Sequence, residues 1–97
     1  MIYNNVVLTV NDAVHVAQVR ALLAELAERS RAEPGCVRFD VFQGQSESRW
    51  FLLVERWESQ AALDQHRLAS AFRDLYQPKV LPLVQRTPYA CDLVSGT

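Results

Sequence analysis

The chain has 97 residues, of which 49% are hydrophobic and 22% charged, an ordinary globular mixture that excludes an intrinsically disordered protein. Its length predicts a single domain over residues 1–97. Ten basic and eleven acidic side chains give a net charge of −1, which argues against nucleic acid as the main partner. No apolar run approaches the roughly 20 residues of a membrane helix. Because the first residues also lack a basic leader, we expect a cytoplasmic protein without a membrane partner.

The first two predicted elements are a strand and a long helix. Residues Ile2 to Val10 are rich in β-branched and aromatic side chains, which is typical of a strand. From Ala13 to Ala32, apolar residues recur at spacings of three and four, which predicts an amphipathic helix with Asp12 as its N-cap. Glu33-Pro34-Gly35 should end this helix, because proline cannot continue the hydrogen-bond ladder and glycine tolerates the turn.

A β-hairpin is predicted next. Cys36 to Gln43 alternates in part between apolar and polar side chains, and a polar turn separates it from Trp50 to Trp57. The second of these segments is almost continuously apolar. We therefore expect it to be a strand that is covered on both faces.

Two helical pieces and a last strand complete the predicted chain, over Gln60–Leu68, Ser70–Val84 and Thr87–Val94. Ser59 is the expected N-cap of the first helical piece. The second piece contains Pro78 and Pro82, so a kink or a break is expected there.

The order of these elements, βαββαβ, predicts an α+β fold of the ferredoxin-like class. Such a fold has a four-stranded antiparallel sheet with helices on one face. The third strand carries large apolar groups on both sides, with Trp50 and Leu52 on the side opposite Phe51 and Leu53. An uncovered apolar sheet face is an association surface, so we expect a homodimer that packs sheet against sheet.

Three stretches, Glu33–Gln43, Phe51–Ser59 and Ala62–His66, resemble the antibiotic biosynthesis monooxygenase domain family, and the similarity extends over nearly the whole chain. The resemblance implies a dimeric α+β barrel with a pocket between the sheet and the helices of each protomer. Members of this family include cofactor-independent monooxygenases that oxidise polyphenols with O₂ and quinol monooxygenases. Haem-degrading monooxygenases and the isomerase of phosphorylated autoinducer-2 share the fold.

Two positions depart from the patterns of particular subgroups. Quinone-forming enzymes of polyketide pathways resemble this chain but carry an asparagine where Leu53 stands. Haem-degrading members have a histidine on the last helix, where this chain has Tyr76. The resemblance therefore favours neither of these two subgroups.

His66 and Glu55 are the candidate catalytic residues. His66 shares a helix face with Leu63 and should point toward the sheet, where an imidazole can take a phenolic or enolic proton near neutral pH. Its alternative role is a purely structural hydrogen bond. Glu55 lies in an apolar strand and needs a partner, for which His66, Arg38 and Asn5 are candidates. It could orient His66 or form a cross-strand pair with an arginine.

Five further residues are candidates for substrate binding. Trp57 could stack on a flat substrate, Asn5 or its neighbour Asn4 could donate to a substrate oxygen, and three more could line the pocket: Arg38, Phe72 and Tyr76. Each also has an ordinary structural explanation, as a core aromatic, an exposed polar residue or a member of a surface ion pair. The sequence leaves these alternatives open.

The motifs of common cofactor and metal sites are missing from the sequence. Its three glycines form no nucleotide fingerprint, and Cys36 and Cys91 stand in no C-x-x-C motif. We expect no metal site, no cofactor and two free thiols.

Together these features favour a cofactor-independent monooxygenase that acts with O₂ on a small, electron-rich aromatic. One alternative is an isomerase of a phosphorylated or enolisable metabolite, which would use cations such as Arg38, Arg67 or Arg73. The other is a non-catalytic dimer that binds a small ligand.

Overall fold

The computed structural model describes all residues, 1–97. Its elements follow one another along the chain as β1 (Ile2–Val10), η1 (Ala13–His15), α1 (Val16–Arg31), β2 (Cys36–Gln43), β3 (Trp50–Trp57), α2 (Gln60–Leu68), η2 (Ala71–Val80), η3 (Leu81–Leu83) and β4 (Val84–Cys91). The strands form one antiparallel sheet in the order β2-β3-β1-β4. The predicted ferredoxin-like α+β fold is confirmed.

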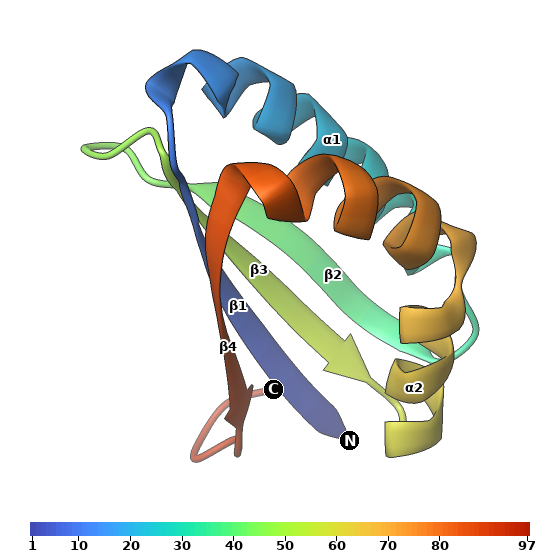
Figure 1. Cartoon of the computed structure of the whole chain (residues 1–97). Coiled ribbons are helices and arrows are strands. Elements are labelled where there is room, and N and C mark those ends of the chain that lie inside the picture. Colours follow the sequence, from blue (N-terminus) through green and yellow to red (C-terminus); the bar gives the residue numbers. More distant parts are fainter.

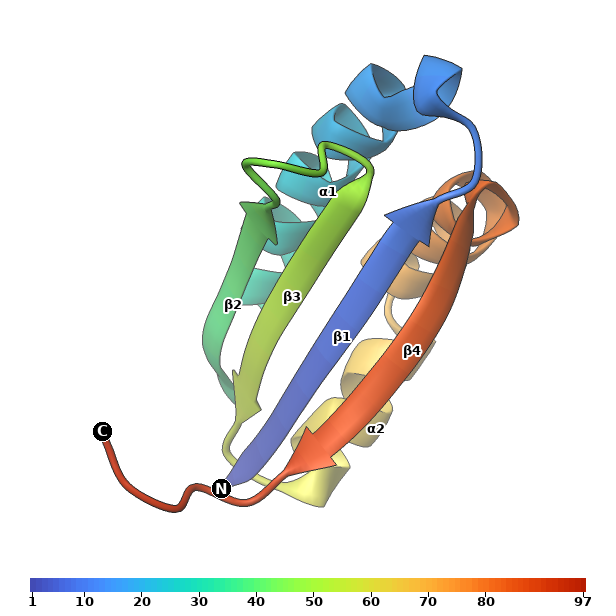
Figure 2. The same ribbon diagram turned by 90° about the vertical axis from the view of Figure 1, so that its left-hand side faces the viewer.

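All helices cover the same face of the sheet (Figure 1). The opposite face is uncovered along its whole length, as Figure 2 shows. The hydrophobic core lies between the sheet and the helices and contains 17 buried side chains, among them the aromatic residues Trp57, Tyr76, Phe39 and Phe51. The helix-covered face is therefore the only one that can enclose a site within this chain.

The predicted elements are confirmed for the first two thirds of the chain. β1, β2, β3 and α2 have the bounds expected from the sequence. The Asp12 side chain accepts a hydrogen bond from the Val14 backbone N–H at 3.0 Å, and Ser59 accepts one from Ala62 N–H at 3.1 Å. Both residues cap helices as predicted, although the first turn after Asp12 is the 3₁₀-helix η1.

The predicted C-terminal elements need correction. The last strand begins at Val84 instead of Thr87 and ends at Cys91. The preceding segment does not break at Pro78, because η2 is a π-helix in which the Leu81 N–H bonds to the Tyr76 carbonyl, five residues back. This wider turn accommodates a proline that lacks an N–H. Pro82 then lies in the short 3₁₀-helix η3.

The expectation that β3 is covered on both faces is wrong within this chain. Its side chains alternate strictly between buried and half-buried. Phe51 and Leu53 face the helices, whereas Trp50, Leu52 and Val54 lie on the uncovered face. Large apolar residues on both faces of β3 thus led to the expectation of two covering layers, but this chain supplies only one.

Gly35 lets the turn between α1 and β2 approach α2 closely. Its φ is +82°, in the left-handed region that favours glycine, and a Cβ placed on it would lie 2.5 Å from Ala62 Cβ. The Gly35 carbonyl also accepts a hydrogen bond from the Glu58 N–H at 2.8 Å. This turn therefore fixes where α2 begins relative to the end of α1.

We predict that Gly35→Ala lowers the free energy of unfolding by about 2 to 4 kcal/mol, from left-handed backbone strain and steric overlap with Ala62. Urea denaturation measures the change. Gly96→Ala is the matched control, since Gly96 also has a positive φ but its Cβ would lie 3.5 Å from a flexible Leu93 side chain. Equal losses in the two variants would contradict the close approach at Gly35.

Candidate active site

His66 is buried between α2 and the sheet. It lies in the last turn of α2, and only 4% of its surface is exposed. Leu63, one turn earlier on the same face, is the other buried residue of this helix. The prediction that His66 points toward the sheet is confirmed.

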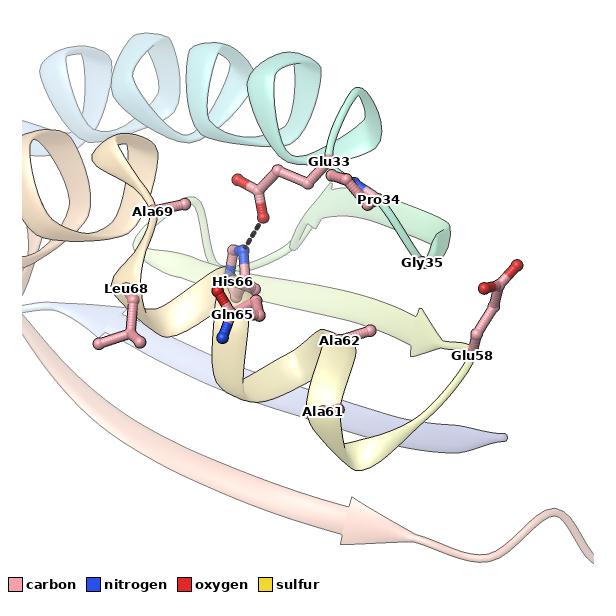
Figure 3. Close-up of a pocket in the computed structure, with 10 residues that line it drawn as sticks. All are labelled: Glu33, Pro34, Gly35, Glu58, Ala61, Ala62, Gln65, His66, Leu68 and Ala69. Carbon is pink, nitrogen blue, oxygen red and sulfur yellow. Dashed lines mark hydrogen bonds and ion pairs between the residues drawn. The ribbon is translucent and has the colours of Figure 1, made fainter.

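A carboxylate from the turn after α1 holds the imidazole of His66. Glu33 Oε1 lies 2.7 Å from His66 Nδ1 (Figure 3). The carboxylate can only accept, so Nδ1 carries the hydrogen that is shared with Glu33. In a neutral imidazole Nε2 then has a free lone pair, and it makes no hydrogen bond within the chain. This geometry leaves Nε2 as the atom available to a ligand.

Glu33, and not Glu55, is thus the hydrogen-bond partner of His66. Glu55, the orienting residue considered from the sequence, makes no hydrogen bond with His66 in the structure. Glu33 was missed because it is 33 positions from His66 and stands in the segment that ends α1. The only signal available was an acidic residue next to the Pro34-Gly35 turn.

Glu55 forms a separate buried polar contact on β3. Its Oε1 accepts a hydrogen bond from Trp57 Nε1 at 3.1 Å, and Asn4, opposite it on β1, supplies another. Burial raises the pKa of Glu55 above its ordinary value, and the two hydrogen bonds together with the charges of His66 and Arg86 oppose that rise. The expected partners Arg38 and Asn5, and the cross-strand arginine pair, are not found.

Aromatic rings surround His66. The ring centres of Trp57, Phe72 and Phe39 lie 4.5, 5.5 and 5.7 Å from the imidazole. The ring centre of Tyr76 lies 5.2 Å from that of Phe72, so the predicted pairing of these two residues on one helix face is confirmed. The rings restrict the orientation of the imidazole and exclude bulk water from one side of it.

Tyr76 places a phenol near Glu55. Its hydroxyl accepts a hydrogen bond from Arg86 Nε at 3.2 Å. Burial raises the pKa of Tyr76, which keeps the phenol neutral, while the Arg86 charge opposes the shift. Arg86 belongs to β4, and no pattern in the sequence singled it out.

Two hollows meet at His66. An open groove of about 510 Å³ lies on the outer side, between the turn of Glu33 and α2 (Figure 3). On the inner side is a cavity of about 10 Å³, roughly the space of one water molecule. Its polar lining comes from Asn4, Glu55, Tyr76 and Arg86. His66 borders both, so its ring separates the groove from the polar interior.

Asn5 and Arg38 do not reach this site. The Asn5 amide donates to Cys91 Sγ at 3.3 Å, and Arg38 Nε is paired with Asp40 Oδ2 at 3.0 Å. Strand alternation explains the error, because Asn4 on β1 and Phe39 on β2 face the helices and their sequence neighbours face the other way. Of the two asparagines that were considered, Asn4 is the one that lies at the site.

The chain contains no group of three or more His, Cys, Asp or Glu side chains placed to hold a metal ion. Cys36 and Cys91 are free thiols, as expected. Burial, together with the nearby Glu33 and Glu55, raises the pKa of the Cys36 thiol to about 11, so it is not a reactive thiolate. No helix combines the length and the apolar character needed to cross a membrane.

The sequence matches a family model described as antibiotic biosynthesis monooxygenase over residues 1–77. A relative from Synechocystis, named uncharacterized protein sll1783, is 35% identical over 57 residues, covering 59% of this chain and 39% of that protein. YcnE of Bacillus subtilis, which carries a provisional monooxygenase name, is 33% identical over 48 residues, or half of each chain. The matched part thus spans half or less of these curated relatives.

Solved structures resemble the whole chain. One described as an antibiotic biosynthesis monooxygenase is 27% identical, with a TM-score of 0.85 over 96% of this chain and 99% of the other. Rv0793 from Mycobacterium tuberculosis is also 27% identical, with a TM-score of 0.79 over 98% and 100% of the two chains. The arrangement of strands and helices is shared throughout.

We predict that the pH dependence of stability reports on Glu55. Because its folded pKa is raised, the folded state binds a proton more tightly than the unfolded state. The stability that this proton contributes is fully present below the unfolded pKa of Glu55 and is lost as pH rises through its folded pKa. Glu55→Gln cannot lose a proton, so its free energy of unfolding relative to wild type should increase from pH 4 to pH 8 in urea denaturation. A difference between variant and wild type that does not change with pH would contradict the raised pKa of Glu55.

Proposed function

This chain belongs to the antibiotic biosynthesis monooxygenase family, and we propose that it is a cofactor-independent monooxygenase that oxidises a small, electron-rich aromatic, a quinol or polyphenol, with O₂. One observation carries the proposal. His66 is buried, its Nδ1 is bound to Glu33, its Nε2 makes no hydrogen bond, and its side chain borders both an open groove and a small inner cavity. We further propose that residues 1–97 act as one domain around this site.

In the proposed reaction His66 is the general base. Nε2 accepts the proton of a bound phenol, and the Glu33 carboxylate stabilises the imidazolium that forms. Glu33 acts as a positioning residue, since it fixes the tautomer and the orientation of the ring. The phenolate left behind is electron-rich and reacts with O₂.

The reaction balances without a further reductant, because the substrate supplies all the electrons. For a simple hydroquinone, one oxygen atom of O₂ enters the ring to give a hydroxyquinone and the other leaves as water. A C–H bond and two O–H bonds of the substrate break. The imidazolium of His66 returns its proton to the oxygen atom that leaves as water. O₂ is therefore the only co-reactant required.

Trp57, Phe72 and Tyr76 form the apolar wall on the inner side of His66 in this proposal. Glu55 borders the inner cavity, and burial raises its pKa, which favours a carboxyl group that shares a proton with a substrate oxygen over one that repels it. Asn4 lies on the same side of the sheet and is the member of the Asn4-Asn5 pair to which we assign the binding role.

No observation in the structure favours the isomerase alternative. A phosphorylated substrate requires cationic donors, and the predicted candidates do not line the groove. Arg38 is paired with Asp40 on the opposite face, and Arg73 is exposed on η2. Arg67 borders the inner cavity and lies 4.0 Å from Asp64.

We also propose that the chain forms a homodimer through the uncovered face of the sheet. Leu52, Val54 and Phe42 lie on this face without a covering layer, and 52% of the Phe42 surface is exposed. A two-fold axis would bury this apolar surface against itself. α2 lies on the helix side of the sheet (Figure 1), so the groove that its residues line would stay open in such a dimer.

We predict that His66→Ala abolishes oxygen uptake on a panel of hydroquinones and polyphenols, measured with EDTA-treated protein and an oxygen electrode. Loss of a positioned base typically costs about 10² to 10⁴-fold. Glu33→Gln should lower kcat by about tenfold, because a neutral amide stabilises the imidazolium less. His15→Ala, in η1 and far from the groove, is the control. Uptake that persists in His66→Ala would refute the proposed base, and a panel without any uptake would favour the binding module.

We predict that Leu52→Asp converts a dimer into a monomer in sedimentation equilibrium, because it places two charges in the proposed sheet-to-sheet interface. Leu52 is half-exposed within one protomer, so the fold should tolerate the charge. Val14→Asp, at an exposed apolar residue of η1, is the control. A wild-type protein that is monomeric at every concentration would contradict the dimer.

A further inference from the structure

The open groove beside His66 has a floor of small apolar side chains. Ala61, Ala62, Ala69 and Leu68 line it, and the Pro34-Gly35 turn forms its other wall (Figure 3). Short side chains leave room for a flat ring above them without supplying any directional contact. Selectivity between aromatic ligands in this groove must therefore come from its few polar residues.

These polar members include two carboxylates and no lysine or arginine. Glu33 lies beside His66, and Glu58 lies at the end of the groove next to Gly35 (Figure 3). Glu58 Oε2 is 3.8 Å from the position that a Cβ on Gly35 would take, so the carboxylate is close to the wall of the groove. Glu58 is exposed and takes part in no ion pair of the structure.

The neighbouring arginines do not compensate this charge. Arg29 Nη2 donates to Ser70 Oγ at 2.9 Å, and Arg29 Nη1 lies 4.0 Å from Glu25 Oε2. Arg67 faces the inner cavity and Asp64. Neither side chain lines the groove, so the lining keeps the negative potential of its own carboxylates.

We propose that this groove selects neutral or cationic aromatics and rejects anionic ones, and that Glu58 is the residue that sets this preference. A carboxylate beside a recess with low-dielectric walls repels an anion and attracts a cation more strongly than it would on an open surface. At physiological ionic strength the effect extends about 8 Å, which is enough to act within the groove. The substrate then carries no carboxylate, sulfonate or phosphate.

This inference rests on the proposed function only in taking an aromatic ring as the ligand. Charge selection itself is a property of binding and can be measured without turnover. The test is therefore made anaerobically, so that failure of the oxygenase chemistry and failure of charge selection give different results.

The experiment titrates ¹⁵N-labelled protein with three ring compounds of one shape: hydroquinone, 2,5-dihydroxybenzoate and 2,5-dihydroxybenzylamine. Amide shifts of Ala62 and Gln65, which line the groove, report binding. We expect the cation to bind about three- to tenfold more tightly than hydroquinone and the benzoate to bind more weakly by a similar factor. The spread should shrink at 0.5 M salt.

Glu58→Gln should reduce the ratio of cation to anion affinity, and Glu58→Lys should invert it. Glu28→Gln is the matched control, because Glu28 is exposed on α1 outside the groove and the substitution changes the net charge equally. Equal affinity for the three compounds, or a ratio that does not change in Glu58→Lys, would overturn the inference. Oxygen uptake in the His66 assay has no bearing on either result.

Discussion

The close contact between the Glu33–Gly35 turn and α2 is the constraint on which the rest of the site depends. Gly35 allows this approach because it has no side chain to meet Ala62, and its carbonyl fixes Glu58 at the start of α2. The same approach places Glu33 within 2.7 Å of His66. Without it, the end of α1 and the last turn of α2 would have no reason to share a hydrogen bond, and the groove would lose one wall.

The buried polar groups are divided into two sets by the imidazole. Glu33 approaches His66 from the groove side, whereas Glu55, Asn4 and Tyr76 lie on the interior side. The two sets differ in burial. Glu33 is partly exposed and paired with His66, while burial raises the pKa of both Glu55 and Tyr76. The imidazole therefore lies between a partly exposed carboxylate and an enclosed set of polar groups whose charged forms are disfavoured.

Local patterns in the sequence were enough to predict most of the fold. Periodicity, caps and the Pro34-Gly35 turn determined the first five predicted elements, and His66 was placed on the correct face. The partner of His66 could not be predicted, because a contact across 33 residues depends on how the turn meets α2. Asn5 and Arg38 lie away from the site for a related reason. The alternation of side chains along a strand does not say which of its two faces the helices cover. The π-helix was not predicted either, because the apolar spacing and the proline of this segment are also compatible with a kinked α-helix.

The π-helix η2 makes the site sensitive to the number of residues in this segment. Each residue of an α-helix turns the chain by about 100°, so removing one residue from η2 would rotate everything before the deletion relative to everything after it by that angle. A deletion between Tyr76 and Leu81 would restore ordinary helical spacing around Pro78, yet it would turn Phe72 away from the imidazole or displace β4 from β1. The number of residues in this segment therefore matters to the site more directly than the identity of most of them, since a deletion moves Phe72 or β4 and an exposed substitution moves neither.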